Sequence, residues 1–118
     1  AMILINRARE TVLCDNVREA KTLQEKRIGL LESDGKTGLF MKTHWGIHTF
    51  GMKTPIDVLI LDRKNKVVKY KRNIKPNRIF FWNPMYNNVV EVPTALVPRG
   101  AVRIGDEIVE KLPKGMVG

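Results

Sequence analysis

The side chains best suited to chemistry lie in one stretch of the chain, between Trp45 and Asp62. His48 and Asp57 stand there within ten residues of each other, and an imidazole and a carboxylate are common general acid–base groups in enzymes. Glu91 could join them if it faces the same cleft, because such a cluster can transfer protons. These three residues make a small hydrolase or isomerase one hypothesis for the function.

The same stretch also has the character of a binding loop. Gly46, Gly51 and Pro55 interrupt regular backbone, and a continuous apolar strand begins at Ile56. A loop fastened to a rigid strand is a common way to build a site. Aromatic side chains on such a loop could form an apolar pocket in which a few polar groups orient the ligand. The ligand-binding candidates are Trp45, His48, Thr49, Met52, Asp57 and Glu91.

The two histidines do not predict a metal site. His44 and His48 are four residues apart, but Gly46 between them disfavours the helix that would align both rings. Cys14 is the only cysteine, which excludes an internal disulfide and a cysteine-rich zinc site. Ser33 has no histidine near it in sequence, so a serine triad has little support. We therefore expect no metal and no other cofactor, and the sequence favours a binding or accessory protein over an enzyme.

The basic charge of the chain suggests a different class of partner. The net charge is +9, and the segment from Arg63 to Arg78 carries basic side chains without an acidic one. Aromatic residues from Phe80 to Trp82 follow this segment, and such a mixture suits phosphates and bases. The simpler interpretation is a solvated hairpin that keeps the protein soluble. The nucleic-acid candidates are Lys64, Lys66, Lys69, Lys71 and Arg72.

Short apolar runs separated by turn residues predict a chain rich in β-strands. Residues 62–66 form a polar turn between two such runs, and residues 73–87 have the composition of a long loop. The predicted strands are Met2–Ile5, Thr11–Cys14, Gly38–Lys42, Ile56–Leu61, Val67–Tyr70, Asn88–Pro93 and one within Ala101–Val109.

One helix is predicted among these strands. Asn16 and Glu19 have the spacing of a capping box, and the apolar residues that follow fit a helix over Val17–Ile28. The expected fold is therefore mainly β, an antiparallel jelly-roll-like β-sandwich or barrel with one short helix packed on it.

The block from His48 to Val58 reads His-Thr-Phe-Gly-Met-x-x-Pro-Ile-Asp-Val, and in this it resembles the domain-of-unknown-function family 192, DUF192. Weaker similarities lie on both sides of the block, and together they cover residues 11–110. These outer segments are Arg27–Leu31, Gly38–Met41, Val90–Pro93 and Ile104–Ile108. The resemblance implies a compact, jelly-roll-like β-sandwich and implies no particular reaction.

The sequence therefore predicts a single domain over residues 1–118 that binds a small molecule, a peptide or another protein near the His48–Asp57 loop. Nucleic-acid binding through the hairpin of residues 63–78 and acid–base catalysis are the alternatives. No apolar run approaches the ~20 residues of a membrane span. Together with the single cysteine, this favours a cytoplasmic protein without a membrane partner.

Overall fold

The computed structural model describes residues 2–28, 35–44 and 46–112. Most of the regular structure is β-strand, so the prediction of a mainly β fold is confirmed. The elements in chain order are β1 (Met2–Asn6), β2 (Thr11–Ala20), α1 (Leu23–Ile28), β3 (Gly38–Lys42), β4 (Gly46–His48), β5 (Ile56–Leu61), β6 (Val67–Ile74), β7 (Ile79–Phe81), β8 (Asn88–Pro93), the 3-10 turn η1 (Thr94–Leu96) and β9 (Ile108–Lys111).

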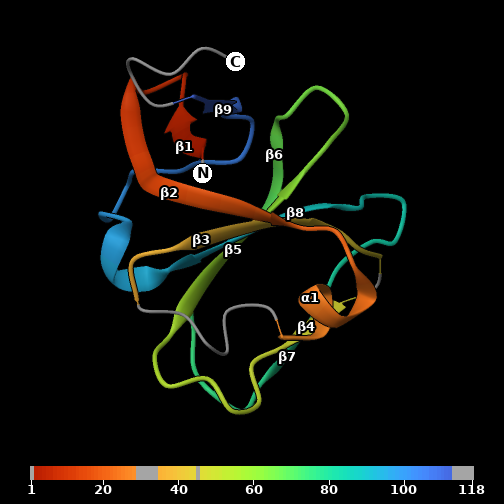
Figure 1. Cartoon of the computed structure of the whole chain (residues 1–118). Coiled ribbons are helices and arrows are strands. Elements are labelled where there is room, and N and C mark those ends of the chain that lie inside the picture. The colour runs from red at the N-terminus through yellow and green to blue at the C-terminus, as the bar shows by residue number, and fades with distance from the viewer. Residues whose placement is uncertain (1, 29–34, 45, 113–118) are drawn as a thin grey trace.

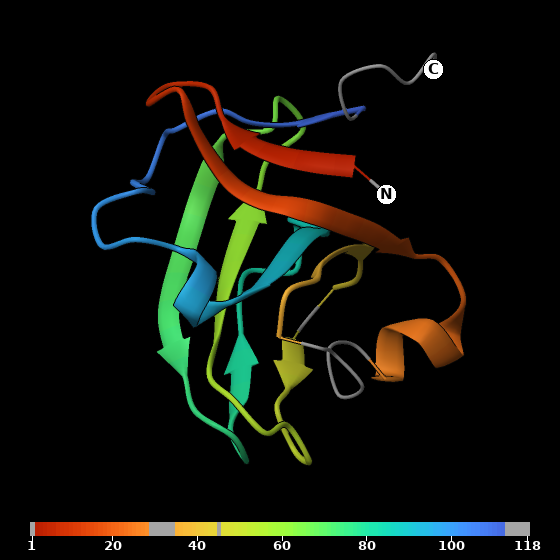
Figure 2. The ribbon, with the colours of Figure 1, turned by 60° about the vertical axis from the view of Figure 1, so that its left-hand side comes forward.

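The main sheet has seven strands in the order β6-β5-β8-β3-β2-β1-β9. Its described pairs are antiparallel except β2 with β3, which run parallel from Val17. The sheet curls until its two ends meet, where the amide of Val67 donates to the carbonyl of Asp106 at 2.9 Å and that of Ile108 to Asn65 at 2.8 Å. A separate two-stranded ribbon of β4 and β7 lies at the opposite end of the molecule from β1 and β9 (Figures 1 and 2).

Two apolar clusters fill the two faces of the sheet. Side chains of β5 alternate between them, so that Leu59 and Leu61 point into the curl while Val58 and Ile60 point to the other face. All six residues of β5 are buried, and five of the six are apolar. The inner core, within the curl, includes Leu4, Leu13, Leu59, Val90, Val92 and Ile108. The outer core, between sheet and ribbon, includes Leu39, Met41, Met52, Ile56, Val58, Ile60 and Trp82.

The predicted helix over Val17–Ile28 is wrong in its first half. Residues up to Ala20 belong to the ten-residue strand β2, which pairs first with β1 and then with β3. Val17 and Ala20 are buried while the two residues between them are exposed, so this end of β2 has the three-residue spacing of buried positions that also occurs in a helix. A capping box does exist, but between Thr22 and Glu25: each side chain bonds the other's backbone amide, at 3.1 and 3.3 Å, ahead of α1.

Two further expectations are corrected. The predicted loop over residues 73–87 contains β7, which pairs with β4. Gly46 permits this pairing, because a Cβ there would lie 2.7 Å from the carbonyl oxygen of Phe80. The last strand covers Ile108–Lys111 rather than lying within Ala101–Val109, since the preceding residues turn at Gly105, where φ is 91°.

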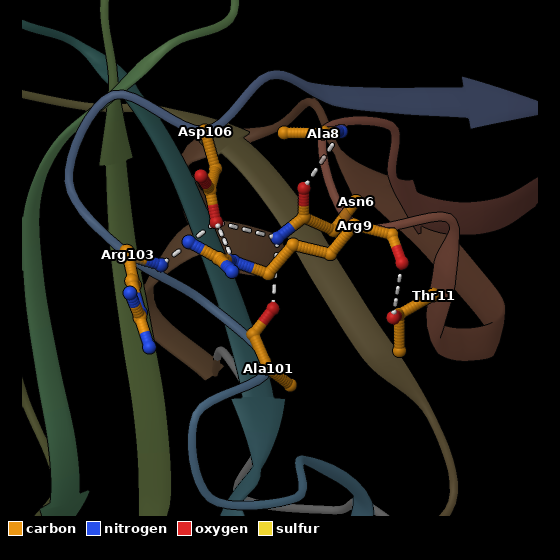
Figure 3. Close-up of polar contacts among 7 residues, drawn as sticks. All are labelled: Asn6, Ala8, Arg9, Thr11, Ala101, Arg103 and Asp106. Atoms are coloured by element: carbon orange, nitrogen blue, oxygen red, sulfur yellow. Dashed lines mark hydrogen bonds and ion pairs between the residues drawn. The ribbon is translucent and has the colours of Figure 1, made fainter.

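A polar cluster fastens that turn to β1 (Figure 3). Asp106 Oδ2 accepts hydrogen bonds from Asn6 Nδ2 and Arg9 Nε, both at 2.8 Å, and from the Arg103 amide at 2.9 Å. Asn6 also donates to the carbonyl of Ala101 at 2.8 Å. Burial would raise the pKa of Asp106, but the Asn6, Arg103 and Arg9 donors outweigh it and hold the pKa below its ordinary value. The cluster thus stabilises the loop beside the seam of the curled sheet.

Candidate functional site

Asp57 lies near the start of β5, inside the curl and without exposed surface. Its Oδ2 accepts hydrogen bonds from the Tyr70 hydroxyl at 2.5 Å and from Arg72 Nη1 at 3.1 Å. Its Oδ1 accepts from the Asn73 amide at 2.9 Å and from the Thr94 hydroxyl at 2.6 Å. Four donors from β6 and the segment after β8 therefore satisfy this buried carboxylate, as a buried charge requires.

An open pocket lies beside this network. It is lined by Arg72, Asn73, Thr94, Arg99 and Gly100, and its volume is about 530 Å³. This lies within the range of roughly 300–1,000 Å³ that is typical of small-molecule sites. The pocket lies at the end of the β5–β6 pair where Ile56 pairs with Ile74, away from the turn that connects the two strands. We call it the mouth pocket. Arg72 reaches it with 31% of its side chain exposed, while its partner Asp57 stays fully covered.

Tyr70 keeps the network in one protonation state. Burial raises its pKa to about 12, and its hydrogen bond to Asp57 adds to the increase while the bond with Arg72 opposes it. The phenol therefore remains protonated near neutral pH and donates to the carboxylate. Arg72 donates to the same hydroxyl at 3.3 Å, which fixes the guanidinium from two sides.

Glu91 lies on the other face of the sheet from Asp57. It pairs with Val58 on β5 and with Leu39 on β3, so its side chain enters the outer core. Only 2% of the residue is exposed, and Oε1 has no hydrogen-bond partner among the described residues. Burial raises the pKa of Glu91 to about 7. The two buried carboxyl groups therefore differ in their hydrogen-bond partners: Asp57 has four donors, and Oε1 of Glu91 has none among the described residues.

His48 lies on the exposed side of the ribbon. Its neighbour Ile47 packs against the outer core, so His48 faces away from it. The imidazole stacks on Phe50, with ring centroids 5.4 Å apart. His44, also exposed, has Nδ1 2.7 Å from the carbonyl oxygen of Pro84. His48, Asp57 and Glu91 are thus in three separate places and do not form a set for proton transfer.

Thr49 and Met52 are buried and support the loop. The Thr49 hydroxyl donates to the Lys75 carbonyl at 2.7 Å and accepts from the Arg78 amide at 2.8 Å. Met52 contributes to the outer core. These contacts fasten the segment before β5 to the segment before β7. Trp45, the remaining candidate, lies outside the described residues.

The basic hairpin has two kinds of basic residue. Lys64, Lys66, Lys69 and Lys71 are exposed, and Asp62 organises the turn by accepting the amides of Lys64 and Lys66 at 2.8 and 2.9 Å. Arg72 differs, because its guanidinium is bound to Asp57. Of the five candidate residues, the four lysines are therefore exposed, whereas Arg72 is partly covered.

Residues that complete the Asp57 network were missed from the sequence. Tyr70 and Arg72 are two positions apart on β6, and this spacing places both on one face of a strand. That alternation was the available signal for a polar pair. Thr94 bonds Asp57 and Arg99 lines the mouth pocket. Both come from the segment after β8, and nothing in their local sequence points to this part of the fold.

Two further searches cover the described part of the chain. Across residues 2–28, 35–44 and 46–112, no group of three or more His, Cys, Asp or Glu side chains could hold a metal ion. Within the same residues, no helix has the length and apolar character needed to cross a membrane.

Residues 4–109 match the DUF192 family, described as uncharacterized ACR, and the chain belongs to this family. The fold is similar to the crystal structure of a proposed transcription regulator from Sinorhizobium meliloti 1021, with a TM-score of 0.71, 17% identity and coverage of 92% of this chain and 91% of that one. It is also similar to a protein of unknown function from Novosphingobium aromaticivorans, with a TM-score of 0.73, 16% identity and coverage of 92% and 82%. No curated protein matches the chain.

Proposed function

We propose that this protein binds a small anionic molecule, such as a carboxylate or a phosphate, in the mouth pocket. The observation that carries the proposal is the pair Arg72 and Arg99 on one open pocket, with Arg72 held in place by buried Asp57. A guanidinium fixed in this way loses little freedom when it binds an oxyanion. The proposal keeps the predicted class of function, small-ligand binding, but places it in a pocket beside Asp57 that the candidate residues of the His48–Asp57 loop do not line.

The charges of the pocket favour an anion. Arg72 and Arg99 contribute two positive charges and Asp57 one negative charge, while Tyr70 is neutral because its pKa is about 12. Asn73 and Thr94 are the polar uncharged residues of the wall, and the Thr94 hydroxyl already donates to Asp57. A net positive pocket on a chain of net charge +9 also attracts anions from a distance.

The test is titration of isotope-labelled protein with inorganic phosphate and with malonate at constant ionic strength, followed by amide resonances. We expect the largest shifts at Asn73, Thr94 and Gly100. Arg99→Gln should weaken binding about tenfold, the equivalent of one charge-assisted hydrogen bond. Arg103→Gln is the matched control, because Arg103 is exposed and lies outside the pocket. Equal binding by both variants, or shifts confined to other regions, would contradict the proposal.

A second candidate function is nucleic-acid binding by the basic hairpin. The specific observation is that Lys64, Lys66, Lys69 and Lys71 are all exposed on the turn and on β6, an end strand of the sheet. Replacement of the four lysines with Gln should abolish binding of an oligonucleotide at low salt. If the unchanged protein does not bind one, the hairpin is a solvated surface.

A further inference from the structure

The ribbon of β4 and β7 presents aromatic side chains to solvent. Ile47 and Phe80 are its inward residues and pack against the outer core. The residues next to them therefore point outward, and three large apolar side chains on this side are strongly exposed. These are Phe50 at 47%, Ile79 at 55% and Phe81 at 65%, and together with His48 we call them the aromatic face.

The rings of the aromatic face have fixed neighbours. Phe81 lies opposite Gly46 in the register, and its ring covers the glycine so closely that a Cβ would be 2.7 Å from Phe81 Cδ1. Phe50 stacks on His48. Rings held in this way lose little conformational freedom when a flat partner stacks on them.

Positive charge borders the aromatic face. Lys69 Nζ lies 3.2 Å from the Phe81 carbonyl oxygen and 5.1 Å from the centre of the Phe80 ring. Lys71 is two residues further along the same strand and is also exposed, and Arg78 is an exposed residue directly before β7. The sequence contains no acidic residue from Lys42 to Ile56 or from Arg63 to Val90. Both strands of the ribbon and the neighbouring strand β6 therefore carry no negative charge.

The combination of exposed rings and positive charge favours one class of binding partner. A second copy of the chain would bring like charges together, since each chain carries +9. A nucleic acid supplies phosphates for the lysines, and its bases can stack on exposed rings. Stacking requires unpaired bases, because those of a duplex are already stacked on each other. We propose that the aromatic face and its bordering lysines bind single-stranded nucleic acid, an inference that rests on the second candidate function and adds its base-contacting surface.

The experiment measures the anisotropy of a labelled oligothymidine of about 12 nucleotides, within the usual site size of such proteins, at low salt. Phe81→Ala and Phe50→Ala should each weaken binding about tenfold, from the loss of one stacked base. Ile104→Ala is the matched control, because Ile104 is 63% exposed but lies outside the ribbon. Lys71→Gln should reduce the slope of log affinity against log salt by about one. Thermal unfolding verifies that each variant is folded.

The outcomes separate the inference from the function on which it rests. If the unchanged protein binds no oligonucleotide, both are overturned. If it binds but the phenylalanine variants bind equally well, or a duplex of equal length binds as tightly as the single strand, the hairpin function stands and the aromatic face is excluded. Binding to vesicles of anionic lipid without binding to the oligonucleotide would assign the surface to a membrane and overturn the inference.

Discussion

Two buried carboxyl groups lie on adjacent strands of the same sheet, one register step apart. Asp57 pairs with Val92 and points into the curl, whereas Glu91 pairs with Val58 and points to the other face. Both have almost no exposed surface, 0% for Asp57 and 2% for Glu91. Asp57 accepts four hydrogen bonds, while Oε1 of Glu91 has no partner in the described residues. Burial alone therefore does not determine how a carboxyl group is accommodated.

Strand β6 supplies the difference. It offers Tyr70 and Arg72 on the inner side, where both reach Asp57. On the other side it offers Lys69, whose ammonium group lies instead at the ribbon beside the Phe81 carbonyl. One carboxyl group thus has a cation and three further donors within reach. The other lies on the face of the sheet that carries the outer core, where burial favours its neutral form.

The largest effect is expected when Asp57 is replaced with Asn. Each oxygen of Asp57 accepts from one hydroxyl and from one N–H group that can only donate. The amide NH2 would therefore face an N–H donor at either position, so at least one bond is lost, and the guanidinium loses its counter-charge. We expect a decrease of about 3 kcal/mol in the free energy of unfolding, measured with urea. Asp15→Asn, at an exposed position of β2, is the control. A loss below about 1 kcal/mol would mean that Asp57 is no better accommodated than an exposed acid.

Glu91 should make the free energy of unfolding depend on pH. Its folded-state pKa of about 7 exceeds the ordinary value of 4.5. The stability that depends on the neutral carboxyl group is therefore fully present below pH 4.5 and is lost as the pH rises through 7. The loss should amount to about 3 kcal/mol. Glu91→Gln, which has no proton to lose, should remove this slope. A slope that persists in Glu91→Gln must come from other groups and would end the contrast with Asp57.

Tyr70→Phe removes one of the four donors without creating a large cavity. The remaining three donors still satisfy both oxygens of Asp57, so the expected loss of stability is smaller, about 1.5 kcal/mol. Tyr86→Phe, a tyrosine outside the network, is the matched control. An ultraviolet titration should also lose its most alkaline tyrosine transition, near pH 12, in Tyr70→Phe but not in Tyr86→Phe. Loss in both variants would show that the transition does not belong to Tyr70.

The smallest effect concerns Asp106, which lies between the two extremes. It is well supplied with donors, yet Arg9 is 31% exposed and water can replace it. Arg9→Gln should therefore cost less than about 1 kcal/mol. A larger loss, measured by the same urea unfolding, would mean that the cluster in Figure 3 contributes as much to stability as the Asp57 network does.

The sequence by itself determined where the main strands lie and to which family the chain belongs. The largely apolar run of β5 predicted a buried strand, and the motif from His48 to Val58 identified DUF192. Composition and alternation are local properties, so they can be read without knowing which segments become neighbours. The sequence also identified Asp57 and Glu91 as candidate site residues. It predicted that they could face one cleft, but they point to opposite faces of the sheet.

Only the tertiary structure decided what surrounds each of these groups. The four donors to Asp57 lie 13 to 37 residues away in sequence, and they converge because β6 and η1 both lie beside β5. The ribbon of β4 and β7 likewise exists only as a pairing of distant segments, neither of which has a strong strand signal of its own. Which face a side chain occupies depends on register. One step of register separates a carboxylate with four donors from a carboxyl group whose Oε1 has no partner in the described part of the chain.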